Sequence, residues 1–145
     1  MAGWRAACLS ALSRIRVLQI RARMVAARLG RGEEARDYAV KLATLSEVLE
    51  RAALKLETVV YTGVASESAG EALAVLAEAL RKMRHALPPP LQHDALALWR
   101  ELSELSQSMA PDSVIHLSSS TLEAEAERVL REAEEVARSR LSEQR

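Results

Sequence analysis

Two long stretches joined by a short turn decide the fold. They are residues 4–29, WRAACLSALSRIRVLQIRARMVAARL, and residues 33–61, EEARDYAVKLATLSEVLERAALKLETVVY, separated by Gly30-Arg31-Gly32. Apolar residues recur in both stretches at alternating intervals of four and three, the heptad pattern of helices packed side by side. Two such helices around a glycine-containing turn predict a long antiparallel hairpin. At a rise of about 1.5 Å per residue, each arm is expected to be about 40 Å long.

The heptad pattern also predicts which side chains meet inside the hairpin. The expected seam residues are Ile15, Leu18, Val25, Leu42, Leu45, Leu49 and Leu56. A second apolar stripe on the first helix lies off this seam, at Leu9, Leu12, Ile20 and Met24. One partner helix cannot cover both stripes. Either a third helix of the same chain covers the second stripe, or the stripe serves another subunit.

Further breaks at Thr62-Gly63-Val64, Pro88-Pro89-Pro90 and residues 111–120 separate three shorter helical segments. These segments, at about 68–86, 92–108 and 121–142, are rich in strong helix formers and contain no strand-like alternation. Ser68 with Glu71, and Ser120 with Glu123, have the spacing of capping boxes. The sequence therefore predicts an all-α protein in which three shorter helices pack along the hairpin.

The expected organisation is one helical core, a linker and a terminal helix. The core covers 1–108, with the hairpin at 4–61 and the third and fourth helices at 68–108. Residues 109–120 form the linker, and 121–145 form an acidic fifth helix.

The chain has 145 residues with 20 bases and 20 acids, so its formal net charge is zero. The charges are unevenly distributed along it. Residues 1–32 contain seven arginines and no acid, whereas residues 93–145 contain six bases and eleven acids. Such polarity indicates an anionic partner for the basic part, a self-interaction of the acidic part, or both.

The basic first helix has the composition of a helix that binds an anionic membrane surface. Guanidinium groups bind lipid phosphates, and an aromatic ring favours the interface. The residues predicted to contact the membrane are Trp4, Arg5, Arg14, Arg16, Arg21, Arg23 and Arg28. The competing interpretation is a solvated face whose arginines pair with acids elsewhere in the chain. Nucleic acid is not an expected partner, because the chain has no aromatic platform or recognised reading helix.

Other functional classes find no support in the sequence. No uninterrupted apolar run approaches the length of a membrane span, and the N-terminus lacks the pattern of a secretory signal. Cys8 lies on the hairpin seam, where a buried thiol is expected. His85, His93 and His116 lack metal-ligand spacing, and no phosphate-binding loop is present. We therefore expect no enzyme activity, no cofactor and no metal.

The second helix and the order of elements resemble a known family. Residues 35–39, ARDYA, and 54–59, LKLETV, followed by Gly63, are similar to the second-helix signature of archaeal ESCRT-III proteins of the cell-division B (CdvB) group. The basic first helix, the proline break before the fourth helix and the acidic helix at 123–141 follow the family's order. The resemblance covers nearly the whole chain.

The resemblance implies an ESCRT-III-like core and a non-enzymatic role in membrane remodelling, during cell division or vesicle budding. It further implies two kinds of protein partner, copies of the same chain in a homopolymer and paralogous ESCRT-III subunits, on the cytoplasmic inner face of the cell membrane at the division site. In the family, the acidic helix packs against the hairpin tip of its own or a neighbouring chain. A solvated terminal helix is the alternative interpretation.

The chain also departs from the family. Its first helix is short, and it lacks the proline-rich ATPase-binding linker and the winged-helix tail, so it resembles a short core paralogue. A degenerate match to the helix that engages the disassembling AAA-type ATPase falls at Glu134, Ala137, Arg140, Leu141, Gln144 and Arg145. A functional alternative of another class is a soluble helical adaptor that binds one protein partner without polymerising.

Overall fold

The computed structural model describes residues 2–109 and 118–143. These residues form α1 (Ala2–Ala27), α2 (Glu33–Thr62), α3 (Glu67–Met83), a short 3-10 helix η1 (Arg84–Ala86), α4 (Pro89–Met109) and α6 (Ser119–Glu143). The predicted all-α class is confirmed, because the described ranges contain helices and no strand. Most of the predicted linker 109–120, with His116, lies outside these ranges, as do Gln144 and Arg145.

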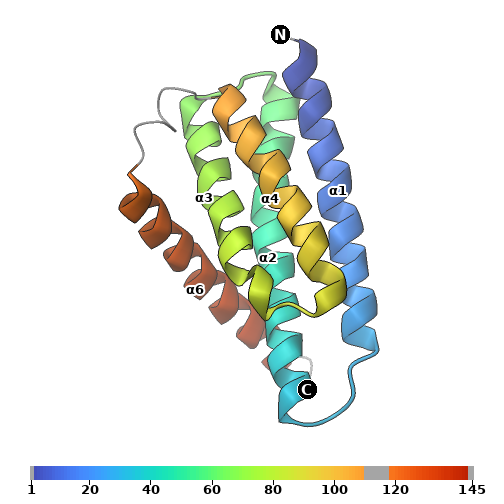
Figure 1. Ribbon diagram of the computed structural model, residues 1–145. Helices are drawn as coiled ribbons and strands as arrows, with labels where there is room; N and C mark the ends of the chain where they lie inside the picture. The colour runs from blue at the N-terminus through green and yellow to red at the C-terminus, as the bar shows by residue number, and fades with distance from the viewer. Residues whose placement is uncertain (1, 110–117, 144–145) are drawn as a thin grey trace.

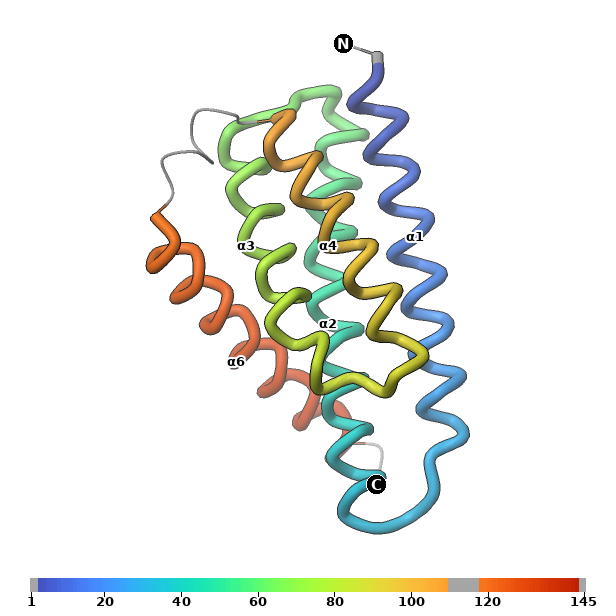
Figure 2. Tube along the Cα trace, viewed as in Figure 1, coloured from blue at the N-terminus to red at the C-terminus, as the bar shows by residue number. Residues whose placement is uncertain are grey.

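The first four helices run alternately down and up, side by side (Figure 1). Each contacts its two neighbours in the order α1, α2, α3, α4, with α4 returning to α1, so α1 and α3 lie diagonally opposite each other. The turn joining α1 to α2 extends beyond the connection between α3 and α4 (Figure 2). This leaves one end of the α1–α2 pair uncovered by α3 and α4.

Leucine and alanine fill the centre of this bundle. Six of the seven side chains predicted for the seam are buried, namely Ile15, Leu18, Leu42, Leu45, Leu49 and Leu56. Val25 is half-buried, because it lies toward the end of α1 that α3 and α4 do not cover. The opposite side of the core comes from α3 and α4 through residues such as Leu73, Leu80, Leu91, Leu98 and Leu102.

A glycine ends α2 and a proline begins α4, at two of the breaks predicted from the sequence. Gly63 has a left-handed φ of 72°, and its N–H donates to the Val59 carbonyl at 3.0 Å, which closes the end of α2. Leu87 is extended, as the residue before a proline prefers, and α4 begins at Pro89.

The two predicted capping boxes are wrong in their cap residue. The cap of α3 is Ser66, whose Oγ accepts from the Ala69 N–H at 3.1 Å, while Ser68 lies inside the helix. At the start of α6, the Ser118 Oγ accepts from the Thr121 N–H at 3.2 Å, in place of Ser120. In both cases the helix begins one or two residues earlier than predicted, because a preceding serine offers the same hydroxyl.

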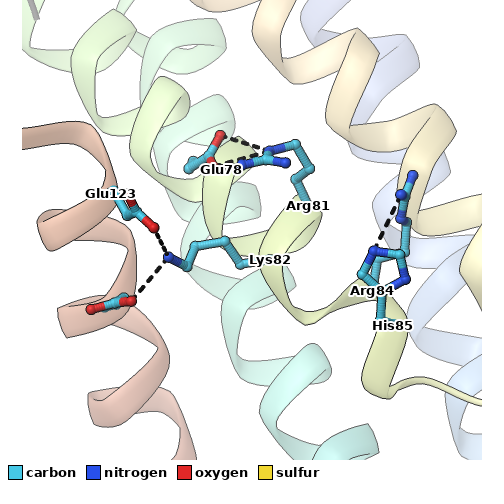
Figure 3. Close-up of polar contacts among 7 residues, drawn as sticks. Glu78, Arg81, Lys82, Arg84, His85 and Glu123 are labelled. Carbon is cyan, nitrogen blue, oxygen red and sulfur yellow. Dashed lines mark hydrogen bonds and ion pairs between the residues drawn. The ribbon is translucent and has the colours of Figure 1, made fainter. Parts of the chain in front are cut away.

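The last helix, α6, packs across α2 and α3. Small residues make this approach possible, since the α6 side chains that are buried are Ala126, Val129, Ala133 and Ala137. Lys82 of α3 points toward α6, where its Nζ donates to Glu123 at 2.9 Å and Glu127 at 3.0 Å (Figure 3). These bonds raise the pKa of Lys82, and Lys82 in turn lowers the pKa of Glu123.

Candidate interaction face on α1

The side of α1 that faces away from the bundle carries a row of exposed apolar side chains, which we call the outer row. It consists of Leu9, Val17, Ile20 and Met24, each between 51% and 55% exposed. Spacings of eight, three and four residues place them on one helix face. Of the two explanations for the second stripe, cover by a third helix fails for Leu9, Ile20 and Met24. Of the predicted stripe, only Leu12 is half-buried. Val17 belongs to the outer row in the structure but not to the stripe predicted from the sequence.

Arginines border the outer row on both sides. Arg14, Arg21 and Arg28 repeat every seven residues along one edge, and Arg16 and Arg23 do so along the other. No acidic residue occurs in α1. A helix face with a basic border and an apolar centre can bind an anionic surface and bury its apolar side chains there.

Three of these arginines have carboxylate partners within the chain. The Arg14 Nε lies 2.8 Å from a Glu101 oxygen, and Arg21 forms an ion pair with Asp94, so both link α1 to α4. On the other edge, Arg16 bonds Glu50 at 2.7 Å and Glu57 at 2.8 Å, linking α1 to α2. This is the pairing that the competing interpretation of the basic helix predicts, and it applies to these three residues.

The remaining arginines of the predicted set are differently placed. Arg5, Arg23 and Arg28 are exposed and make no ion pair with any residue in the described ranges. Trp4 is half-buried and packs against the core. The structure therefore brings the predicted arginines to one helix but divides them into three that join helices and three that are open to solvent, and it directs the indole of Trp4 inward.

A polar cluster around the buried Gln19, at the α1–α2 contact, is absent from the sequence prediction. Gln19 is 6% exposed, and its Nε2 donates to Glu50 at 3.1 Å and to the Ser46 carbonyl at 3.3 Å. Its side-chain oxygen accepts from Arg16 at 2.9 Å. Glutamine beside a heptad seam gives no distinctive signal, because its burial depends on the acceptors that the facing helix supplies.

The residues predicted for ATPase contact lie mainly where α6 meets α2. Ala137 is buried, and Arg140 bonds Glu47 of α2 at 3.0 Å. Glu134 pairs with Arg138 on α6 itself at 3.2 Å, and Leu141 is half-buried. Arg145 lies outside the described residues. The end of α6 thus lies beside the first turns of α2, close to the α1–α2 turn (Figure 1).

Five of the seven acids of α6 are paired with bases of α2, α3 and α6, away from the arginines of α1. Besides the Lys82 pairs, Glu132 lies 3.6 Å from Arg51 of α2, and Glu125 bonds Arg128 at 2.6 Å. The acidic helix and the basic helix therefore occupy different sides of the bundle.

The described parts of the chain contain neither a metal-binding cluster nor a membrane-spanning helix. Histidine, cysteine, aspartate and glutamate side chains do not gather there in groups of three or more that could hold a metal ion. None of the helices placed by the structure combines the length and hydropathy needed to span a bilayer. Comparisons of the chain with protein families, with characterised proteins and with solved structures gave no match.

Proposed function

We propose that this protein is a non-enzymatic membrane-remodelling subunit that binds anionic membranes through the outer face of α1 and polymerises there. The observation that supports the proposal most directly is the outer row of half-exposed apolar side chains, bordered by arginines on a helix that contains no acid. Burial of the row in the interfacial region and attraction of the arginines to lipid phosphates would act together.

The lipid contact is carried by a subset of the residues first considered. Arg23 and Arg28 border the outer row and have no carboxylate to displace in the described ranges, so they are the arginines assigned to lipid headgroups. Arg14, Arg16 and Arg21 would have to exchange a protein carboxylate for a lipid phosphate. The apolar part of the contact falls to Val17, Ile20 and Met24 in place of the half-buried Trp4.

Assembly rests on the resemblance to archaeal ESCRT-III proteins of the CdvB group. In this proposal the α1–α2 pair is the family's hairpin, with α3 and α4 packed along it as the rest of an ESCRT-III-like core. The subunits form open filaments by head-to-tail contacts, with copies of themselves and with paralogues, on the inner face of the cell membrane in division or budding. A disassembling AAA-type ATPase would need α6 to lift from α2, because Ala137 is buried there.

Co-sedimentation with anionic and neutral liposomes across a salt series tests the membrane contact, and electron microscopy of the pellets tests polymerisation. We expect binding to anionic liposomes at low salt, with filaments. The double variant Arg23→Glu/Arg28→Glu should weaken partitioning about 30-fold or more, at about 1 kcal/mol for each basic residue lost near the surface. Arg100→Glu/Arg131→Glu makes the same charge change at exposed arginines of α4 and α6 and should have a much smaller effect.

A soluble helical adaptor is the second candidate, and the ion pairs of Arg14, Arg16 and Arg21 favour it, because they satisfy half of the predicted basic set within the chain. An adaptor would neither sediment with anionic liposomes at low salt nor form filaments. That result, or equal loss of binding in both double variants, would contradict the membrane proposal.

A further inference from the structure

A groove of about 780 Å³ opens between the start of α1 and the end of α2, at the end of the bundle opposite the α1–α2 turn. Its apolar lining comes from Leu9 and Leu12 of α1 and from Val60 and Tyr61 of α2. Tyr61 is 94% exposed, which makes it the most exposed of the large hydrophobic side chains described. Leu54 and Val64 are both more than half exposed; Leu54 lies two turns before Tyr61, and Val64 lies just after α2.

Such a surface has the composition of a protein contact. Tyrosine is among the residues that contribute most to the free energy of binding when an interface buries them. Its side chain presents a large area with few rotatable bonds. The four aromatic residues of this chain are Trp4, Tyr38, Tyr61 and Trp99. The other three are half-buried, so only Tyr61 projects fully into solvent.

The charges on the groove identify which occupant it fits. Arg5 lies on one side and Glu57 on the other. Glu57 accepts from Arg16 through Oε1 at 2.8 Å, and Oε2 receives no bond from any described residue. Arg5 makes no ion pair in the described ranges. An anionic membrane or a wholly acidic partner would be repelled by Glu57, and a wholly basic partner would be repelled by Arg5.

A second copy of this chain presents a positive and a negative charge in the arrangement that the groove requires. When two identical grooves face each other about a two-fold axis that runs along the groove, a residue on one side of the groove in one copy meets the residue on the other side in the second copy. Arg5 of each copy then faces Glu57 of the other, and Tyr61 of each packs against the leucines of the opposite groove. The rest of the outer row, from Val17 to Met24, cannot pair in this way, because the arginines on both of its borders would meet arginines.

We propose that two copies of the protein associate through these grooves into a two-fold dimer. The pairing deepens the assembly part of the proposed function and rests on it. A two-fold contact closes on itself, so this contact supplies dimers, and the polymer needs a second contact elsewhere.

Sedimentation velocity of the full chain, over micromolar to millimolar concentrations and without lipid, tests the dimer. We expect concentration-dependent dimerisation that Tyr61→Ser weakens at least tenfold. Met24→Ser removes an exposed apolar side chain, 52% exposed, from the outer row and should leave dimerisation unchanged. Because liposomes are absent, failure of membrane binding and failure of dimerisation are separate results.

Charge reversal gives a test that misfolding cannot imitate. Arg5→Glu and Glu57→Arg should each weaken self-association at least tenfold, since each places like charges across the two-fold axis. An equimolar mixture of the two variants should associate as a heterodimer, because glutamates of one copy then face arginines of the other.

Several outcomes would overturn the proposal. A wild-type chain that stays monomeric over the whole range, or a mixture of charge variants that does not associate, excludes the two-fold pairing. Equal weakening by Tyr61→Ser and Met24→Ser would place self-association elsewhere. Loss of liposome binding in Tyr61→Ser without loss of self-association would assign the groove to lipid.

Discussion

Glu50 is held in its charged form by two neighbours on α1. A hydrogen bond from Gln19 and one from Arg16 lower the pKa of its carboxyl below the ordinary value of 4.5. Because the folded-state pKa is the lower one, this contribution to stability is fully present above pH 4.5 and is lost as the pH falls through the folded-state pKa.

The variant Glu50→Gln should therefore lose stability in a pH-dependent way. At pH 7 we expect a free energy of unfolding lower by up to about 1 kcal/mol, since Glu50 is partly open to solvent. The difference from the wild type should shrink toward pH 3, as measured by urea unfolding. Glu104→Gln changes an exposed carboxylate of α4 that forms no ion pair with the described residues and should show no such trend. A constant difference for Glu50→Gln would contradict the assigned cause.

Gly63 and Gly30 allow a matched test of backbone conformation. Gly63 ends α2 at a φ of 72°, which an L-residue with a Cβ adopts only with strain, whereas Gly30 has no such angle. Space for a Cβ exists at both positions. Gly63→Ala should lower the free energy of unfolding by about 1 kcal/mol, and Gly30→Ala should leave it unchanged or raise it slightly. Equal effects in thermal or urea unfolding would show that the left-handed conformation is not required.

The attachment of α6 depends on small side chains at its contact with α2 and α3. Ala133 is 0% exposed there, while Ala124 of the same helix faces solvent. Burying an unpaired carboxylate is strongly unfavourable, so Ala133→Asp should detach α6. Amide hydrogen exchange is then expected to accelerate throughout α6 and to change little in α1 and α4. Ala124→Asp introduces the same group outside the contact and should preserve the protection of α6.

The helices themselves follow from short-range rules, and the heptad intervals correctly predicted most of the buried side of α1 and α2. The cap residues were predicted less well, because Ser66 and Ser68, like Ser118 and Ser120, are chemically equivalent in sequence. The exposure of the outer row could not be predicted either. It depends on where α4 crosses α1, which is set by packing between helices distant in the sequence.

The sequence predicted that the arginines of α1 form the candidate site. It did not predict which of them pair with carboxylates and which are open to solvent. The sequence reading named the arginines of α1, whereas their partners, such as Asp94 and Glu101, lie some seventy to ninety residues away along the chain. Periodicity carries no information about such pairs. The chemistry of Trp4 alone predicts a place at a membrane interface, and in the structure Trp4 packs against the core.

In the molecule as a whole, opposite charges meet mainly between neighbouring helices, while burial of leucine and alanine supplies the common core. Exposed ion pairs each contribute about 0–1 kcal/mol, and salt near 1 M screens charges beyond about 3 Å. We expect the thermal midpoint to shift by only a few degrees between low salt and about 1 M NaCl. Liposome binding should be lost over the same range.

Circular dichroism melts and co-sedimentation at matched salt concentrations measure the two effects. Unfolding at high salt would mean that the ion pairs between helices, and not the apolar core, hold the bundle together.

The single cysteine gives the protein a built-in reporter of its own opening. Cys8 is fully enclosed at the start of α1, and burial raises the pKa of its thiol, so reactive thiolate is scarce in the packed state. A thiol reagent can therefore label it only during excursions in which the start of α1 leaves its neighbours. The labelling rate would time those excursions in the unmodified chain, in solution or on a lipid surface.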